Sequence, residues 1–590
     1  MSGKRPTRVR AAPARLEDEQ AAAFELAELA AAYRNPAASV EVESSSSDES
    51  DDESGPEEEE ERKASDVRPP AFPWTTEHEA VSPLAFLPPR GPRDPPRRCI
   101  TPLDFFHLLL PESFLESMVD MTNEYAARQR ESDKENEAAS AAAAAAAAPH
   151  SSAWEVTTLA ELNALLGCVI YMGIVSMDAT RDYWSELTKQ SFVADCFPRD
   201  RFLALLACLR VSDPEEGEAA DDDRLSKLRQ LIGTLEETML RYFYPGRYVC
   251  VDEAMVAFKG RSIMRQHIAK KKSPTGFKVW MLVDCATNFV CALDVFTGMK
   301  GRRREEGAAG KVVTTLLERL QRDRFHVVAM DGFFSSVQLF EQLLSLGFYA
   351  VGTTRHNRRH FPKELLREVE GKRRGEWVWR QKRGSSLVVT SWMDKKPVNL
   401  LSTCADAKKS NTVQRRTGSE LHDVACPEVL PLYLRYMRGV DVFAQRQSYS
   451  KIGRRSRKWF YSLVWFLVDV AIHNAYILYQ QRHNQQSYDE KAFRKELMQL
   501  LVSGFSARKG AGARRPAPKR ARDSLHRLEH AAQAGDCFRC RGKLRGGQHG
   551  RRSHSRCGDC NIFLCLPDCY NAHIQKEAEL AADRAEAVDE

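Results

Sequence analysis

Two aspartates end short apolar segments, and this position suggests metal-dependent chemistry. Asp252 closes the run YVCVD and Asp331 closes VVAMD. Carboxylates at the ends of adjacent strands converge on one point, and a third carboxylate from a following helix would complete a cage for two divalent metals. Carboxylate oxygens favour Mg²⁺ or Mn²⁺, and two such ions promote phosphoryl transfer. Aspartates also form turns at strand ends, so these two residues alone do not establish catalysis.

A second set of candidate ligands lies near the C-terminus. Two Cys-x2-Cys pairs, separated by 16 residues, are followed by further cysteines and a histidine. The eight candidate zinc ligands are His530, Cys537, Cys540, Cys557, Cys560, Cys565, Cys569 and His573. They suffice for two tetrahedral Zn²⁺ sites, with His549 and His554 as alternatives to His530. The segment is too short to fold on an apolar core, so bound zinc would supply most of its stability.

Basic residues near aromatic ones indicate a nucleic-acid partner, because cations neutralise phosphates and aromatic rings stack on bases. The candidate DNA contacts are Lys270, Lys271, Lys272, Lys278, Arg355, Arg358, Arg454, Arg455, Arg457, Lys458 and Trp459. For residues 453–460 the alternative is a helix-terminal basic cluster with a packed tryptophan. A later basic run predicts a nuclear localisation signal or a DNA-contacting linker. Its basic residues are Arg514, Arg515, Lys519, Arg520 and Arg522.

Charge and cysteine usage favour a nuclear, DNA-binding protein. The formal net charge of +6 includes 12 acidic residues in segment 41–61, so the rest of the chain is more cationic than the total suggests. The N-terminus has no apolar core of a signal peptide, and we expect the scattered cysteines to be reduced. No stretch approaches 18 uncharged apolar residues, so we expect no membrane span. In the long apolar run 456–483, Asp469 and His473 favour a buried helix.

The pattern of elements predicts a mixed α/β core after a helical region. Residues 1–95 are acidic and Pro-rich, and we expect them to be disordered because they cannot bury enough apolar surface. Residues 101–245 show mainly helical apolar spacing, interrupted by an alanine-rich insert at 141–148. The strand candidates that follow include a hairpin and a strand–helix–strand unit.

Four sequence blocks resemble the successive signatures of piggyBac transposases. They read VDEAMVAFKGR, GFKVWMLVD, MDGFFSSVQLFEQLLSLGFYAVGTTRHNRRHFP and RGVDVFAQ, in the family's order and approximate spacing. The resemblance covers roughly residues 100–575. It implies an RNase H-like catalytic core with an insertion domain, a flanking helical domain and a C-terminal zinc module of the cross-braced, RING- or PHD-like kind.

These expectations divide the chain into nine segments. They are a disordered N-terminal region (1–95), a helical dimerisation and DNA-binding domain (96–250), the first part of the RNase H-like core (251–357), an insertion domain (358–437), the second part of the core (438–456), the C-terminal part of the helical domain (457–506), a basic linker (507–524), a Cys/His-rich zinc-binding domain (525–576) and a tail (577–590).

The resemblance also assigns catalytic roles. Asp252, Asp331 and Asp441 match the family's three catalytic aspartates. The sequence departs from the family pattern where Gly332 replaces an Asn, where Arg438 replaces the first Gly of the last block, and where Ala444 replaces a further Asp. Because residues 441 and 444 would share one helical face, the loss of that carboxylate would weaken metal binding.

The resemblance implies cut-and-paste DNA transposition. It implies Mg²⁺ or Mn²⁺ at the aspartates, hairpinned transposon ends, joining at TTAA targets in double-stranded DNA and a homodimer in the nucleus. The departures from the family pattern keep an alternative open: a non-catalytic nuclear DNA-binding or chromatin protein derived from a transposase. A RING-like module alone would also suit a ubiquitin ligase or a histone-tail reader.

Overall fold

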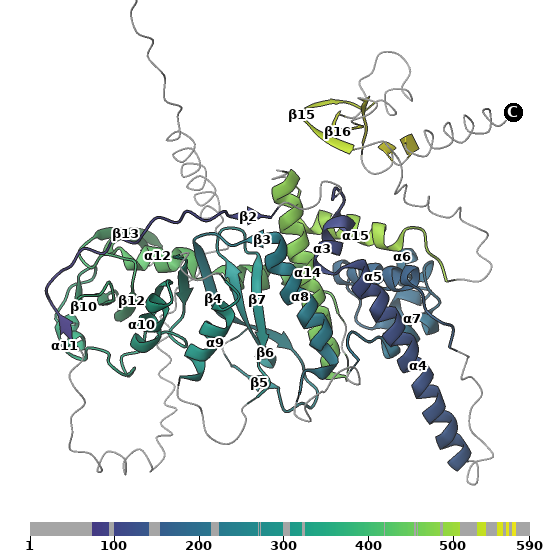
Figure 1. Ribbon diagram of the computed structural model, residues 1–590, viewed down its shortest axis with the longest axis horizontal. Helices are drawn as coiled ribbons and strands as arrows, with labels where there is room; N and C mark the ends of the chain where they lie inside the picture. Colours follow the sequence, from purple (N-terminus) through teal and green to yellow (C-terminus); the bar gives the residue numbers. More distant parts are fainter. Residues whose placement is uncertain are drawn as a thin grey trace, which may run out of the picture. The chain divides into compact units, whose positions relative to one another are not determined.

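The computed structural model describes most of the chain between residues 73 and 573 (Figure 1). The described residues are 73–93, 99–140, 154–213, 223–269, 271, 273–298, 307–320, 325–417, 419–453, 456, 458–483, 488–507, 528–537, 552–557, 562–565, 569–570 and 572–573. Contacts divide the chain into two units, and the larger one comprises residues 73–393 and 399–590. Only residues 394–398 of the smaller unit are described. They form the turn before strand β12 (Pro397–Ser402) and the first two residues of that strand.

Helices occupy the first part of the large unit. They are α3 (Pro102–Leu109), α4 (Glu112–Ser140), α5 (Leu159–Ile174), η2 (Thr180–Trp184), α6 (Ser191–Ala194), α7 (Arg199–Cys208), η3 (Ser226–Leu228) and α8 (Arg229–Tyr242). Helix α3 begins with a capping box, in which Thr101 accepts from the Asp104 N–H while Asp104 binds the Thr101 N–H. Such reciprocal bonds satisfy amides that a helix start leaves free. The helical interpretation of this region therefore agrees with the structure.

A mixed sheet follows. Its strands are β4 (Tyr248–Ala257), β6 (Thr275–Asp284), β7 (Val290–Val295), β8 (Val327–Met330) and β9 (Tyr349–Thr353). They lie in the order β7-β6-β4-β8-β9, with β6 antiparallel to β4 and to β7, and with β8 parallel to β4 and to β9. Two short strands, β3 (Phe243–Tyr244) and β5 (Gln266–His267), and two helices, α9 (Ala308–Leu317) and α10 (Val337–Ser345), accompany them.

Strands from segment 358–437 continue this sheet. Strand β12 (Pro397–Ser402) pairs antiparallel with β9, and β11 (Val388–Met393), β10 (Trp377–Lys382) and β1 (Trp74–Thr75) follow in order. The result is one ten-stranded sheet. The segment also contains α11 (Glu364–Glu370), α12 (Val429–Tyr436) and a two-stranded ribbon of β13 (Ser410–Thr417) and β14 (Glu420–Pro427). The segment expected to be an insertion domain thus extends the core sheet beyond β9 through the pairing of β12 with β9.

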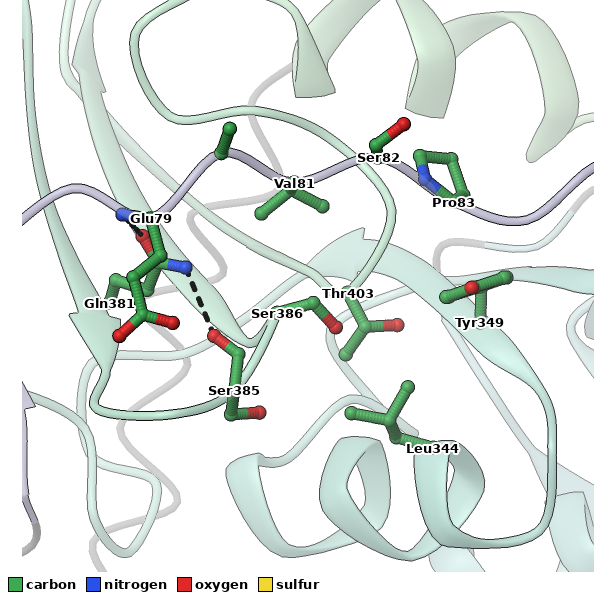
Figure 2. Close-up of a pocket in the computed structure, with 11 residues that line it drawn as sticks. Glu79, Val81, Ser82, Pro83, Leu344, Tyr349, Gln381, Ser385, Ser386 and Thr403 are labelled. Carbon is green, nitrogen blue, oxygen red and sulfur yellow. Dashed lines mark hydrogen bonds between the residues drawn. The ribbon is translucent and has the colours of Figure 1, made fainter.

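An extended segment before the first helix, residues 73–93, forms a strap along the sheet (Figure 1). It includes β1 and β2 (Gly91–Pro92), and β2 pairs with β3. Three side chains accept hydrogen bonds from its backbone. The Glu79 N–H donates to Gln381 Oε1 (Figure 2), the Val81 N–H to Asp406 Oδ2 and the Leu84 N–H to the Tyr349 hydroxyl. The prediction of disorder through residue 95 therefore does not hold for the strap, because long-range bonds offset its chain entropy. Residues 1–72 lie outside the described ranges.

The last helices of the unit enclose a buried ionic network. They are α13 (Gly439–Tyr449), α14 (Trp459–His483) and α15 (Glu490–Val502). Among the described helices only α14 is apolar and long enough to cross a membrane, and 94% of its apolar window is buried within the structure. Arg494 and Asp469 are each 1% exposed and pair at 2.7 Å. Arg494 also pairs with Glu490, which contacts His473. Asp469 and His473 of α14 thus have partners inside the protein, as buried polar groups require.

Candidate active site and metal centres

The sheet register brings Asp252 and Asp331 to neighbouring positions. Val251 of β4 pairs with Met330 of β8 in a parallel ladder, so the next residue on each strand is an aspartate. Asp252 is 8% exposed and accepts from the Glu253 N–H at 2.7 Å. Asp331 lies at the end of β8, where its Oδ1 accepts from the Phe333 N–H at 3.0 Å. Both carboxylates are therefore held by backbone bonds of their own segments.

Helix α13 carries Asp441 to the same part of the sheet. Its first residue, Gly439, packs so closely on β4 and β6 that an added Cβ would lie 2.5 Å from Cys250 Sγ and 3.2 Å from Val283 Cγ1. Only glycine allows this approach without displacement. Asp441 is in the first turn of α13 and is exposed. The close contact at Gly439 thus sets the distance of Asp441 from the strand that carries Asp252.

The Glu253 carboxylate acts on both Asp252 and Asp331. Burial raises the pKa of Asp252 to about 8, and Glu253 and Asp331 act in the same direction while Lys271 opposes them. Burial, followed by the Glu253 carboxylate, raises the pKa of Asp331.

Tyr433 of α12 is a neighbour shared by all three. Burial is the main cause that raises the pKa of its phenol to about 12; the hydrogen bond with Thr353 opposes the rise, and the charges of Asp331, Asp252 and Asp441 add to it. A phenol of such high pKa stays protonated at neutral pH.

The donors suit a hard divalent cation. The half-buried carboxylate of Asp331 raises the cost of ionising the buried Asp252, and a cation would remove that cost. Glu253 Oε2 is also buried and has no hydrogen-bond partner, although it lies 3.7 Å from Lys278 Nζ. Within the described ranges only a group of cysteines has three candidate ligand atoms within 4.8 Å of one another. The three aspartates are thus more widely spaced than that, and common ligation of one ion requires their side chains to move.

Three of the predicted DNA-contacting cations gather at this site. Lys271 pairs with Glu253 at 3.1 Å. Burial alone would lower the pKa of Lys271, but Asp252, Glu253 and Asp441 raise it. Lys278 lies over the Phe333 ring, with Nζ 4.2 Å from the centroid. Arg358 donates to the carbonyls of Gly332 and Phe333 at 3.0 and 2.5 Å.

The other predicted DNA contacts are placed differently. Arg355 is exposed next to Gly332. Lys458 donates to the Ala207 carbonyl at 2.9 Å. Trp459 packs edge-on against the ring of Phe277. Phe277 lies opposite Val256 in the β4–β6 register, and strand alternation places both on the same side of the sheet as Asp252. Lys270, Lys272, Arg454, Arg455 and Arg457 lie outside the described residues, as does the whole basic run from Arg514 to Arg522.

Two neighbours of the aspartates were not expected from the sequence. Glu253 directly follows Asp252, and alternation along a strand would place it on the opposite side. Tyr433 lies in α12, eight residues before Asp441, and no sequence motif marks this tyrosine. Only the adjacency of Glu253 to Asp252 gave a signal in the sequence.

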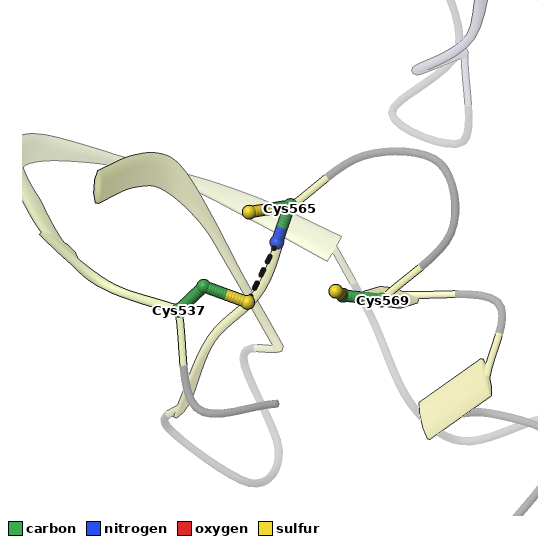
Figure 3. Close-up of side chains that lie close together, drawn as sticks. All are labelled: Cys537, Cys565 and Cys569. Carbon is green, nitrogen blue, oxygen red and sulfur yellow. Dashed lines mark hydrogen bonds between the residues drawn. The ribbon is translucent and has the colours of Figure 1, made fainter. Parts of the chain in front are cut away.

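The C-terminal module brings part of the cysteine series together. It contains a three-stranded sheet of β15 (Leu528–Asp536), β16 (Arg552–Cys557) and β17 (Ile562–Phe563). Cys537, Cys565 and Cys569 place their sulfurs within 4.8 Å of one another, and the Cys565 N–H donates to Cys537 Sγ at 3.2 Å (Figure 3). Three thiols converging in this way suit the soft, tetrahedral coordination of zinc.

The remaining zinc candidates are outside this cluster. Cys557 and His573 are buried but do not belong to the group of three. His530 stacks on His554 with ring centroids 5.2 Å apart, and burial, followed by this neighbour, lowers the pKa of His530. Cys540 and Cys560 lie outside the described residues.

Comparisons with known proteins agree with the geometry. A family model described as Transposase IS4 matches residues 101–476. The human PiggyBac transposable element-derived protein 3 is 26% identical over 428 residues, covering 71% of this chain and 67% of that protein. The human PiggyBac transposable element-derived protein 2 is 24% identical over 445 residues, with coverages of 73% and 68%.

A solved structure shares the fold. The cryo-EM structure of a piggyBac transposase synaptic complex with hairpin DNA matches with a TM-score of 0.59 and 21% identity, covering 81% of this chain and 98% of that one. At this identity the likeness bears on the fold alone.

Proposed function

Because the chain belongs to the piggyBac family of transposases and transposase-derived proteins, we propose that it binds double-stranded DNA at the aspartate site and cuts it by metal-dependent phosphoryl transfer. The observation that carries this proposal is the placement of the aspartates at one part of the core sheet: Asp252 and Asp331 follow paired positions on β4 and β8, and α13, which carries Asp441, packs against β4 at Gly439. Carboxylates from separate elements, set among lysines and an arginine, suit an anionic substrate and divalent cations.

Each group of the site has a role in this proposal. Asp252, Asp331 and Asp441 hold Mg²⁺ or Mn²⁺, which when bound activates the attacking oxygen and stabilises the leaving oxygen. Lys271 and Arg358 supply positive charge for the phosphates around the scissile bond. Tyr433 lies near enough to the aspartates for their charges to act on its phenol, while its hydroxyl bonds to Thr353. The protonated phenol adds no further negative charge to the site.

The finer family properties extend the same proposal. The five-stranded part β7-β6-β4-β8-β9 would be an RNase H-like core, interrupted by segment 358–437. The DNA substrates would be transposon ends and TTAA targets, with hairpinned intermediates and a homodimeric enzyme. The basic run at 514–522 would direct the protein to the nucleus.

A plasmid excision assay with candidate terminal repeats tests the proposal. Single Asp252→Asn, Asp331→Asn and Asp441→Asn changes nearly preserve shape but remove a ligand charge. Each is expected to abolish strand cleavage and leave DNA binding largely intact. Cleavage that persists in any of the three variants would contradict the assignment.

A non-catalytic DNA-binding derivative is the second candidate. It is favoured by Ala444 and Arg438, which stand where the family pattern has an aspartate and a glycine. If the native protein binds DNA but does not cut any terminal repeat tested, even with Mn²⁺, this second function replaces the first.

The C-terminal module is proposed to bind about two Zn²⁺ ions through the eight candidate ligands. Cys537, Cys565 and Cys569 would belong to one site, as in a cross-braced arrangement. Elemental analysis of the purified protein is expected to give about two zinc ions per chain. Cys565→Ser should remove about one of them. Cys208→Ser, which changes a half-buried thiol in the helical region, should remove none. A folded protein without zinc would contradict the proposal.

A further inference from the structure

A partly exposed aromatic side chain follows Asp331 by two residues. Phe333 is 38% exposed, whereas its neighbour Phe334 is 1% exposed. Single exposed apolar residues are common on protein surfaces, so exposure alone carries no conclusion. Phe333 differs because its backbone is tied directly to the site: its N–H donates to Asp331 Oδ1 at 3.0 Å.

The position of Phe333 is fixed from several sides. Arg358 Nη2 donates to the carbonyls of Gly332 and Phe333, which holds the turn. Phe334 meets the Phe333 ring edge-on, with centroids 5.0 Å apart at 89°. A ring held in this way loses little conformational entropy when a ligand stacks on it.

The charges around Phe333 suit a nucleotide. Lys278 Nζ lies 4.2 Å from the ring centroid and 3.7 Å from Glu253 Oε2, and Arg355 is exposed beside Gly332. A base can stack on the aromatic ring while these cations meet the adjoining phosphates. The combination of ring and cations would serve a single-stranded or extruded base better than one inside a duplex.

We propose that Phe333 is a base-stacking residue that holds an unpaired nucleotide of the DNA strand next to the aspartates. The inference rests on the proposed function, since it needs DNA at this site. It adds a specific contact: the base beside the scissile phosphate leaves its own stack and lies on the Phe333 ring. Sequence tolerance is expected at this nucleotide, because every base has an aromatic face.

Photocrosslinking tests the contact directly. The probe is a duplex with a single-stranded TTAA extension that carries 5-iodouracil in place of one thymine, and the protein carries Asp252→Asn to prevent cleavage. The expected crosslink falls on the peptide that contains Phe333. It should persist with Phe333→Tyr, which keeps the ring, and disappear with Phe333→Leu, which keeps apolar volume only.

Affinity for the same probe gives the second measurement. Phe333→Leu should weaken binding about tenfold, as expected for the loss of one base–aromatic stack. The dependence of affinity on salt should not change, because no charge is altered. Phe333→Tyr and the control Leu187→Ala, at a residue that is 96% exposed in the helical region, should bind like the parent protein.

The outcomes separate this inference from the function on which it rests. If the protein binds the probe and Phe333→Leu changes neither crosslinking nor affinity, the stacking role is overturned while DNA binding stands. If the parent protein does not bind the probe even at low salt, both proposals fail. Thermal melts of the Phe333 variants should match the parent, because the side chain is exposed.

Discussion

Ala444 lies on α13, three residues beyond Asp441, and both residues are exposed on the same side of the helix. A carboxylate at 444 would face the same solvent region as Asp441 and would fit without repacking. Ala444→Asp is therefore expected to raise the affinity of the DNA-free protein for Mn²⁺ on the order of tenfold, since affinity for hard cations follows the number of charged ligands.

Titration calorimetry with Mn²⁺ checks this prediction. Ala444→Asn is the matched control, because it adds a side chain of the same shape without the charge. Excision by the Ala444→Asp variant should rise most at low metal concentration. Equal Mn²⁺ affinities for all three proteins would show that a carboxylate at 444 does not reach the metal site.

Gly439 is the residue at which α13 meets the sheet. Gly439→Ala would place a Cβ 2.5 Å from Cys250 Sγ, and overpacking of this kind costs about 1–3 kcal/mol. The displaced helix would also carry Asp441 away from Asp252. We therefore expect a lower free energy of unfolding in urea and a larger loss of cleavage than of DNA binding.

Two comparisons isolate the steric cause. Gly332→Ala should have little effect on stability, because its Cβ would meet nothing closer than the Thr353 hydroxyl oxygen at 3.5 Å. Cys250→Ala combined with Gly439→Ala should recover stability relative to Gly439→Ala alone, since the clashing sulfur is gone. A double variant no more stable than the single one would contradict the explanation.

At the scale of elements, the far end of α13 is anchored by a buried charge. Asp469 Oδ2 of α14 accepts from Gln447 Nε2 of α13 at 3.2 Å and from the Ile452 N–H at 3.3 Å. Asp469 in turn pairs with Arg494 of α15. Gly439 thus positions one end of α13, and this ionic network positions the other.

The two carboxylates of the network respond differently to burial. Burial raises the pKa of Asp469 to about 6, against the opposing effect of Arg494. Burial would also raise the pKa of Glu490, but His473 and Arg494 outweigh it and hold that pKa well below its usual range. The difference follows from the partners, since Glu490 contacts both the His473 imidazole and the Arg494 guanidinium.

Glu490→Gln is expected to destabilise the protein by about 3–5 kcal/mol at pH 7, because it removes one of the two buried carboxylates that pair with Arg494 and the carboxylate that contacts His473. A carboxyl with a depressed pKa contributes stability above its usual pKa of about 4.5 and loses that contribution as pH falls toward the folded value. The difference between the two proteins should therefore be full at pH 7 and shrink below about pH 4.5.

Urea unfolding at pH 7, 5 and 4 measures this difference. Glu237→Gln is the control, since Glu237 is 73% exposed in its i,i+4 pair with Arg241 and such pairs contribute little. A loss of stability in Glu490→Gln that is as large at pH 4 as at pH 7 would indicate a packing effect rather than loss of charge.

At the scale of the whole molecule, the strap joins segments that are distant in sequence. Val81 is 5% exposed in a cluster with Val388 and Ala407. Val81→Asp would bury an unpaired carboxylate there and is expected to cost at least about 2 kcal/mol. Leu87→Asp introduces the same charge in the same strap at a residue that is 88% exposed.

Limited proteolysis and thermal melts test the strap. Val81→Asp should lower the melting temperature and expose the strap to cleavage, whereas Leu87→Asp should behave like the parent protein. If both variants melt like the parent, the strap does not contribute to the stability of the sheet.

Local features of this protein could be derived from its sequence. Apolar periodicity within a few residues predicts the helices of 101–245 and the strands that end in Asp252 and Asp331. The spacing of neighbouring cysteines likewise predicts the metal ligands of the C-terminal module. The buried character of α14 followed from Asp469 and His473, whose charges need partners inside a protein. The order of the sequence blocks identified the family.

The tertiary structure alone decided which distant groups meet. The strap has the composition of a disordered segment, but the side chains of Gln381, Asp406 and Tyr349 fix its backbone. Pairing of β12 with β9 joins segment 358–437 to the core sheet, because strand edges recognise backbone groups rather than sequence. Tyr433 joins the aspartate site only through packing that no local pattern encodes.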